Sequence, residues 1–237
     1  MTTLQVRIWR GTESGEYRDY EVPREESQTV LDIVTYVQRR LDASLAYRFA
    51  CRVGMCGSCA MTVNGESRWT CRTHVSKVAP DDRIEIGPLR NLPVVRDLVT
   101  DMREFFDKWA KARGQFSGTR TRHDDFEPVS PASAEREQVD AAIECIGCGV
   151  CYSACDVVSW NPDYAGPAAL NRAWSLVQDV RDASRADRLR AVAGDAGALA
   201  CHTHMSCTER CPKQISPTAG IAGLKRAIAK AALKGEL

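Results

Sequence analysis

The sequence predicts an α+β protein with two domains, a small mixed domain in residues 1–95 and a helical domain in residues 96–237. Polar and apolar residues alternate in residues 3–9, which is typical of a half-buried strand, and apolar residues recur at helical spacing in residues 29–41. After residue 96, strand signals are weak and helical periodicity recurs. A chain of 237 residues is long enough for two ordinary domains.

The other elements of the first domain follow from turn and strand signals. Strands are predicted at residues 17–22, 60–63 and 83–86, with a hairpin turn at Asn64-Gly65 after the second of them. A glycine-bearing loop separates the predicted helix from that hairpin. Several strands around one helix indicate a small α+β domain.

The second domain is predicted to consist of helices and loops. Apolar and aromatic residues recur every three or four positions over residues 94–111, so we expect an amphipathic helix there. Residues 112–135 combine Gly, Ser, Thr, Pro and charged residues and predict a surface connection. Further helices are expected at residues 134–144, 167–181, 184–193 and 217–234.

Composition excludes several classes of function. The chain is 44% hydrophobic and 27% charged with a net charge of +1, so charge predicts neither a nucleic-acid partner nor a polybasic membrane contact. No apolar run approaches the ~18 residues of a membrane span. No dinucleotide-binding fingerprint is found, so we expect any flavin or nicotinamide on another chain. Neither a secretory signal nor a transit peptide is recognisable, which predicts a prokaryotic chain or a mature form.

The eleven cysteines fall into three groups with none left over. The groups are Cys51, Cys56, Cys59 and Cys71; Cys145, Cys148, Cys151 and Cys155; and Cys201, Cys207 and Cys211. C-x4-C-x2-C with a later cysteine, and C-x2-C-x2-C-x3-C, are spacings of thiolates that hold iron–sulfur clusters. An odd count argues against disulfides, and the second group has too many cysteines for one zinc knuckle. We therefore expect an electron-transfer protein with several centres in series.

The first group has the four thiolates that a [2Fe–2S] cluster needs. Gly54 and Gly57 lie between its members. Glycine lets the backbone come close to a cluster and direct N–H groups at the sulfurs, which stabilises the reduced cluster and raises its potential. The alternative is that both glycines serve only as turn residues.

Each of the other two clusters is predicted to take cysteines from both remaining groups. In two-cluster ferredoxins, three cysteines of one run share a cluster with the fourth cysteine of the other run. The expected [4Fe–4S] ligands are Cys145, Cys148, Cys151 and Cys211. The expected ligands of the other cluster are Cys155, Cys201 and Cys207. His204 stands where a fourth cysteine would complete that set, so we expect a [3Fe–4S] cluster, with ligation of a fourth iron by His204 as the alternative.

Six motifs resemble those of one known family. They are Cys51-x4-Cys56-Gly-Ser-Cys59-Ala, Asp97-Leu-Val-Thr-Asp101-Met102, Cys145-x2-Cys148-x2-Cys151-x3-Cys155, Trp160-Asn-Pro-Asp163, Gly166-Pro-Ala-Ala-Leu170 and Cys201-x5-Cys207-x3-Cys211-Pro-Lys213. Over residues 4–230 the chain resembles the iron–sulfur subunit of succinate dehydrogenase and fumarate reductase, the complex II family. The resemblance implies an N-terminal plant-ferredoxin-like β-grasp domain followed by a C-terminal all-α bacterial-ferredoxin-like domain of the fumarate reductase type.

The resemblance also implies a circuit. A flavoprotein subunit with FAD interconverts succinate and fumarate, as in the respiratory chain and the tricarboxylic acid cycle. Electrons pass through the [2Fe–2S], [4Fe–4S] and [3Fe–4S] clusters to a quinone beside membrane anchor subunits. This chain would carry no substrate site and no catalytic residue. It would lie peripherally at the cytoplasmic face of a bacterial inner membrane. Haem b in the partner subunits, the number of anchors and the direction of turnover are left open.

The resemblance places Trp160, His202 and His204 at the quinone. Alternatives are an interface role for Trp160 and a structural role for His202. The chain departs from the family pattern at Asp156, where members have proline, and at Ser159, where members have a second tryptophan. His204 also replaces an apolar residue. Rival functions are a free-standing ferredoxin, the iron–sulfur subunit of another flavin-dependent oxidoreductase, and a structural metal-binding scaffold.

Overall fold

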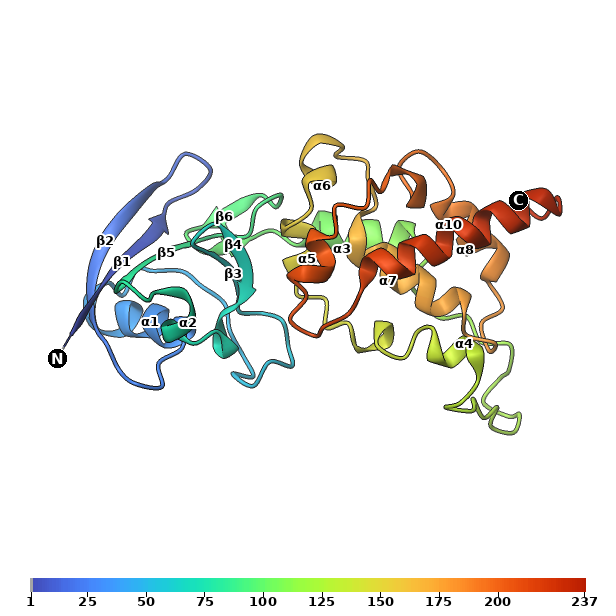
Figure 1. Cartoon of the computed structure of the whole chain (residues 1–237), viewed down its shortest axis with the longest axis horizontal. Coiled ribbons are helices and arrows are strands. Elements are labelled where there is room, and N and C mark those ends of the chain that lie inside the picture. Colours follow the sequence, from blue (N-terminus) through green and yellow to red (C-terminus); the bar gives the residue numbers. More distant parts are fainter. Residues whose placement is uncertain (1) are drawn as a thin grey trace. The chain divides into compact units, whose positions relative to one another are not determined.

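The computed structural model describes residues 2–237, which divide into two compact units. The N-terminal unit contains the residues up to Met102 together with Ile146–Ala154, and the helical unit contains Arg103–Cys145 and Cys155–Leu237. The short helix α5 (Val150–Ser153) therefore belongs to the N-terminal unit, although the preceding segment Arg103–Cys145 belongs to the helical unit. Figure 1 labels most of the helices and strands of both units.

The N-terminal unit is built on a five-stranded sheet with the strand order β2-β1-β5-β3-β4. β1 and β5 are parallel, and the other neighbouring strands are antiparallel. The strands are β1 (Thr3–Arg10), β2 (Glu16–Pro23), β3 (Ala60–Val63), β4 (Glu66–Trp69) and β5 (Arg83–Gly87). The strand predictions for this domain are confirmed, as is the hairpin turn between β3 and β4.

The main helix of this unit, α1 (Val30–Tyr36), continues into a π-helical turn at Val37–Leu41. It begins with a capping box, in which Thr29 and Asp32 each accept a hydrogen bond from the other's backbone N–H. Its buried face packs with the inward side chains of β1, which alternate as a half-buried strand requires. A second, short helix, α2, spans Val75–Val78.

The predicted helix over residues 94–111 is wrong in its first half. Val94–Arg96 (β6) and Val99–Thr100 (β7) form a two-stranded hairpin, and the helix α3 spans only Arg103–Lys111. The reason is the turn residue Asp97, which has a φ of 51° and is 2% exposed. Tertiary contacts of its carboxylate hold this turn and override the helical periodicity of the apolar residues.

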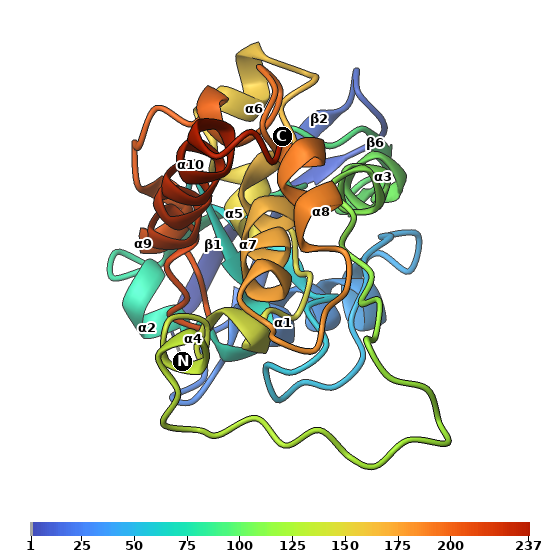
Figure 2. The ribbon, with the colours of Figure 1, turned by 90° about the vertical axis from the view of Figure 1, so that its right-hand side faces the viewer.

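In the helical unit, α7 (Gly166–Val177) is contacted by α3, by α8 (Arg185–Val192) and by α10 (Pro217–Leu233). Figure 2 shows α10 and α8 beside α7. The predicted helices are confirmed here with two exceptions: residues 134–144 form only α4 (Ala134–Glu137) and a 3₁₀ turn, and the helix predicted over residues 167–181 ends at Val177. Two more short helices are α6 (Asp156–Trp160) and α9 (Ser206–Glu209). Within residues 2–237, no helix has both the length and the apolar character needed to cross a bilayer.

Candidate metal centres

The first four-cysteine group lies within the N-terminal unit. Cys51 and Cys56 are on the loop after the π-helical turn, Cys59 directly precedes β3, and Cys71 is in a 3₁₀ turn after β4. The hydroxyl and the backbone N–H of Thr70 both donate to the carbonyl of Cys59, at 2.7 and 3.2 Å. The β3–β4 hairpin thus brings the last two cysteines of the group together.

Hydrogen-bond donors surround the first two sulfurs. Cys51 Sγ accepts from the backbone N–H groups of Met55 and Cys56, at 3.2 and 3.3 Å. Cys56 Sγ accepts from the Ser58 hydroxyl at 3.2 Å and from the backbone N–H of Cys51 at 3.5 Å. The Ser58 hydroxyl, with that backbone N–H, lowers the pKa of Cys56 to about 6. The loop therefore favours the thiolate, which is the form that binds metal.

The other two thiols of this group are buried. Cys59 and Cys71 are 2% and 6% exposed and pack with Leu31 and Trp69. Burial, together with the neighbouring Cys59 thiol, raises the pKa of Cys71 to about 12. Two adjacent buried thiolates are unfavourable without a cation between them. Bound iron supplies that cation, so this donor set fits a cluster.

Gly54 meets the expectation for a loop that curls around a cluster. Its φ is +75°, and its backbone N–H donates to the sulfur of Cys71. A Cβ at this position would lie 2.6 Å from the ring of Trp69, so no side chain fits without a shift. The alternative of a plain turn residue does not explain the N–H that points at a sulfur.

The four cysteines assigned to the [4Fe–4S] cluster divide between the two units. Cys148 and Cys151 belong to the N-terminal unit, whereas Cys145 and Cys211 belong to the helical unit. The prediction that these four cysteines share a [4Fe–4S] cluster therefore still rests on their spacing in the sequence. Lys213, two residues after Cys211, forms an ion pair with Glu144 across 3.1 Å.

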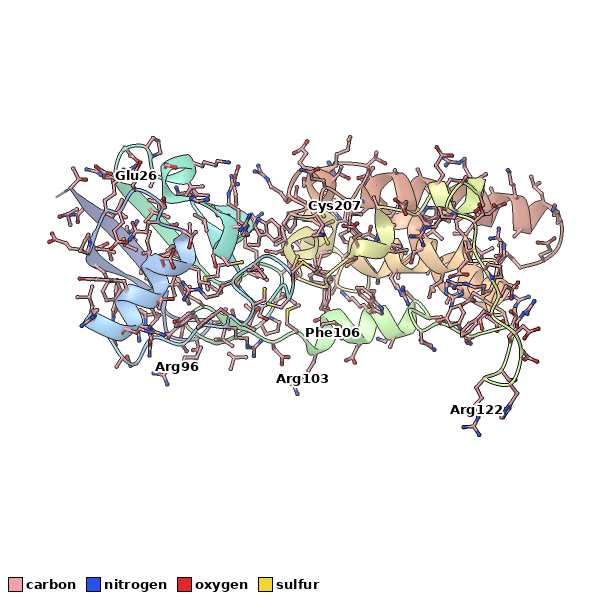
Figure 3. All side chains as sticks on the ribbon, turned by 90° about the horizontal axis from the view of Figure 1, so that it is seen from below. Glu26, Arg96, Arg103, Phe106, Arg122 and Cys207 are labelled. Carbon is pink, nitrogen blue, oxygen red and sulfur yellow. The ribbon has the colours of Figure 1, made fainter. Side chains whose placement is uncertain are left out.

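The three cysteines assigned to the [3Fe–4S] cluster all lie in the helical unit and line one pocket. Cys155 precedes α6, Cys201 follows a 3₁₀ turn at Ala198–Ala200, and Cys207 is in α9, where Figure 3 labels it. Three segments that are distant in the sequence thus supply one thiol each. The structure places no fourth cysteine among the residues that line this pocket.

Burial and hydrogen bonding have opposite effects on the pKa of two of these thiols. Burial raises the pKa of Cys155 and of Cys207, while the backbone N–H groups of Val157 and Val158 and the hydroxyl of Thr218 favour the thiolate forms. The Cys207 Sγ to Thr218 Oγ1 distance is 3.4 Å. Burial makes the thiolate forms of Cys155 and Cys207 unfavourable without a nearby cation, and the donors around them stabilise sulfur ligands. Both features fit an iron–sulfur cluster.

Sequence reasoning missed Tyr164 at this site. Its side chain is 1% exposed, lines the same pocket and is hydrogen-bonded to the sulfur of Cys201. Burial and the neighbouring thiolates raise the pKa of its hydroxyl well above the usual range, so it stays a proton donor. Its position directly after the Trp160-Asn-Pro-Asp163 motif was the available signal.

Trp160, His202 and His204 form an aromatic group at the surface of the helical unit. The ring centroids of Trp160 lie 6.1 Å from those of His202 and 5.9 Å from those of His204, and the two imidazole centroids are 6.2 Å apart. Trp160 is 60% exposed, and both histidines line the three-cysteine pocket. Thr203 and Met205, with φ of 63° and 65°, flank His204 and turn the loop sharply there.

Among residues 2–237, no three or more His, Cys, Asp or Glu side chains are arranged around the position of a single metal ion. The thiolates of a cluster are distributed over two or more iron atoms, so the complete set does not converge on the position of one ion.

Comparisons with known proteins agree with this geometry. Residues 4–107 match the 2Fe-2S iron-sulfur cluster binding domain, and residues 141–215 match the 4Fe-4S dicluster domain. The fumarate reductase iron-sulfur subunit of Mycobacterium tuberculosis is 37% identical over 225 residues, which cover 92% of this chain and 88% of that one. The succinate dehydrogenase iron-sulfur subunit of Paracoccus denitrificans is 36% identical over 83% of this chain and 74% of that one.

These identities extend over most of both chains. The chain belongs to the family of iron–sulfur subunits of succinate dehydrogenase and fumarate reductase. A chain in the solved Mycobacterium smegmatis Sdh1 complex in the apo form superimposes on it with a TM-score of 0.85, at 31% identity and with 96% of each chain covered. The family assignment and the α+β fold class are thus confirmed. The chain is an electron-transfer subunit of this class of oxidoreductase, with a 2Fe–2S domain and a dicluster domain.

Proposed function

We propose that the chain relays electrons one at a time between the FAD of a flavoprotein subunit and a membrane quinone. The route runs through a [2Fe–2S], a [4Fe–4S] and a [3Fe–4S] cluster. The proposed ligands are Cys51, Cys56, Cys59 and Cys71 for the first; Cys145, Cys148, Cys151 and Cys211 for the second; and Cys155, Cys201 and Cys207 for the third. The clusters store single electrons, and the protein sets their spacing and potentials.

One observation carries the proposal: three thiols line a single pocket whose wall includes His202 and His204, with Trp160 exposed beside them. Three thiolates suit a [3Fe–4S] cluster, which lacks one corner iron. An exposed indole offers a flat face and an N–H donor, both of which suit a planar quinone head. The juxtaposition favours electron delivery to a quinone over delivery to a diffusing acceptor protein.

The chain's own hydrogen bonds support the first step of the relay. N–H and O–H groups donate to the sulfurs of Cys51 and Cys56. Such bonds stabilise the more negative reduced state, so they raise the tendency of this site to accept an electron. At the third site, the hydroxyls of Tyr164 and Thr218 donate to sulfurs in the same way.

The proposed partners are the flavoprotein subunit and one or more membrane anchor subunits. The chain would be held peripherally by the anchors at the cytoplasmic face of a bacterial inner membrane. Both directions of turnover, succinate oxidation and fumarate reduction, use the same relay, and the potential of the quinone decides between them. A relative named as a fumarate reductase subunit and one named as a succinate dehydrogenase subunit both match this chain.

Low-temperature electron paramagnetic resonance (EPR) tests the proposal. The complex would be purified anaerobically and reduced first by succinate and then by dithionite. We expect signals of three distinct clusters, and about nine iron atoms per chain as the sum of the three cluster types. Much less iron, or zinc in its place, would contradict the proposed clusters. Intact clusters that donate to soluble acceptors but never to quinone would instead support another flavin-dependent oxidoreductase.

A further inference from the structure

Gly57 lies in the first cysteine loop, but the space beside it is filled by the second group. A Cβ built on Gly57 would stand 2.9 Å from both Cα and Cβ of Cys148 and 3.0 Å from the carbonyl oxygen of Ile146. Real Cβ atoms essentially never approach other atoms closer than 3.0 Å. The backbone at Gly57, whose φ is +73°, thus makes direct contact with a cysteine of the second run within the N-terminal unit.

This contact is held in place from two further points. The hydroxyls of Ser67 and Ser153 are hydrogen-bonded at 2.7 Å, and both residues are buried. The side-chain amide of Asn91 donates to the carbonyls of Tyr152 and Ser153, at 3.1 and 3.3 Å. The segment 146–154 is therefore fixed to β4 and to the loop after β5 directly after Cys151, so it cannot move away freely if Gly57 gains a side chain.

We propose that Gly57 is a positioning residue that sets the separation between the [2Fe–2S] site and the cluster bound through Cys148. The proposal rests on the proposed function, because it assumes that both sites hold clusters. One electron leaves the reduced first cluster and enters the oxidised second cluster, and no bond is made or broken. The flavin of the partner subunit supplies the electron.

The physical reason is the steep fall of electron tunnelling with distance. Gly57 is bonded directly to Cys56, a ligand of the first site, and its backbone touches Cys148, a ligand of the second. The route between the two sites therefore consists of a short stretch of backbone and a single through-space step. A methyl group at Gly57 has to push the loop and Cys148 apart, which lengthens that step.

The chain offers a matched control in Gly54. Its φ of +75° equals that of Gly57 within two degrees, so an alanine meets the same backbone strain in the same loop. Its added Cβ would meet Trp69 and Arg72, which belong to the β3–β4 hairpin and the following turn, and no atom of the second group. Gly54→Ala thus perturbs the first site alone, whereas Gly57→Ala also displaces Cys148.

The experiment compares Gly57→Ala, Gly54→Ala and the wild type in the intact complex. Each would be assayed for iron content, for the EPR line broadening that two nearby paramagnetic clusters cause in each other, and for the rate at which the second cluster is reduced after the first. We expect Gly57→Ala to lose part of the broadening and to slow the second reduction with iron content unchanged. Gly54→Ala should change the first signal but keep the broadening.

The inference would be overturned if Gly57→Ala kept wild-type broadening and rate with full clusters, or if both variants lost broadening equally. If Gly57→Ala failed to assemble its clusters, Ser153→Ala would decide. That variant loosens residues 146–154 without altering the first loop, so reduced broadening supports the inference and wild-type broadening overturns it. Failure of the proposed function is distinguishable, because then the wild type itself would lack the cluster signals.

Discussion

Asp97 stabilises three segments of the N-terminal unit through one carboxylate. It accepts hydrogen bonds from the backbone N–H groups of Gly11 and Ala46, at 2.7 and 2.8 Å. It also forms an ion pair with Arg10, whose Nε lies 3.1 Å away but does not align as a hydrogen-bond donor. Both side chains are almost fully buried. A buried charge that loses its partner is costly, so the contacts of Asp97 stabilise the turn between β6 and β7.

Replacing Asp97 by asparagine tests that role. Asparagine tolerates the positive φ of this position, so the variant removes charge and acceptor capacity without backbone strain. We expect Asp97→Asn to lower the free energy of unfolding by about 2–4 kcal/mol, measured by urea denaturation. Asp19→Asn, at an exposed ion pair with Arg7, is the control and should cost less than about 1 kcal/mol. Equal effects would contradict the interpretation.

Trp160 allows a test of the quinone end of the relay. Trp160→Leu removes the aromatic face and the N–H donor while keeping an apolar side chain. We expect kcat/KM for quinone to fall by roughly 5- to 30-fold, the equivalent of about 1–2 kcal/mol of lost contact. Turnover with an artificial acceptor that takes electrons from the flavin should persist. An equal loss in both assays would show that Trp160 supports assembly of the complex instead.

The site residues differ in how far they could be predicted from sequence. The cysteines were recognisable because ligand spacing is local and cysteine is otherwise rare. Tyr164 was not, because its role depends on its approach to Cys201, which lies on a distant segment. Gly57 was recognised as a residue that allows close approach, but the group that comes close, Cys148, is also distant in the sequence. Pairings between distant segments require the fold.

At the scale of elements, α8 is anchored by a buried ion pair. Arg188 and Asp182 are paired through two contacts, at 2.6 and 3.1 Å, and the side chains of both are 0% exposed. Arg188 also donates to the carbonyls of Arg113 and Gln115, each at 2.9 Å. The pair thus ties α8 to the chain that follows α3, where the sequence predicted only a surface connection.

Neutralising one partner of this pair should destabilise the helical unit. We expect Asp182→Asn to cost about 3–5 kcal/mol, because Arg188 would be left buried without a counter-charge. The matched control is Asp187→Asn on α8, the helix that carries Arg188, where Asp187 and Arg190 form an exposed pair at 2.9 Å. It should cost less than about 1 kcal/mol. Thermal unfolding of both variants checks this, and similar losses would argue against a special role for the buried pair.

The junction between the π-helical turn and β1 should make the N-terminal unit sensitive to acid. The carboxylate of Asp42 accepts from the hydroxyl and the backbone N–H of Ser44 and from Arg10 and Tyr20. These bonds hold the pKa of Asp42 well below its usual range, and the hydrogen bond from the Ser44 hydroxyl has the largest effect. The folded state therefore binds fewer protons, and its stabilisation is present above the unfolded pKa of about 4 and lost as the pH falls below it.

Asp42→Asn should remove this pH dependence. We expect the variant to be less stable than the wild type at pH 7, and the gap between their melting temperatures to narrow as the pH falls from 5 to about 3. Thermal unfolding across this range checks the prediction. Parallel curves for the two proteins would mean that other carboxylates determine the acid response.

The helices and strands could be predicted from sequence where the buried residues recur with the period of a single strand or a single helix. β1 alternates strictly and α1 has a continuous apolar face, so both were recognisable from residues alone. Residues 94–102 also carry a helical pattern, yet they form a hairpin because the buried carboxylate of Asp97 holds a turn in their middle. Periodicity describes one element at a time and contains nothing about such long-range contacts.

At the scale of the whole molecule, the core and the cluster sites have separate sources of stability. The apolar core of the N-terminal unit includes Leu4, Ile8, Ile33 and Ile86 and has no cysteine among its members. The loop from Cys51 to Cys56, in contrast, is largely exposed, and several of its N–H groups have sulfur as their acceptor. Iron that holds those sulfurs therefore stabilises the loop far more than the sheet.

Removal of iron by a chelator should consequently loosen the protein locally. We expect the far-ultraviolet circular dichroism to keep most of its intensity, since the backbone hydrogen bonds within the sheet, α7 and α10 are made without sulfur. Hydrogen exchange should accelerate at residues 51–58 and 201–207, where the backbone surrounds the cluster thiols, and change little in β1 and β5. Loss of protection throughout the sheet would mean that the clusters hold the fold together, and the apolar core alone would then be too small to sustain it.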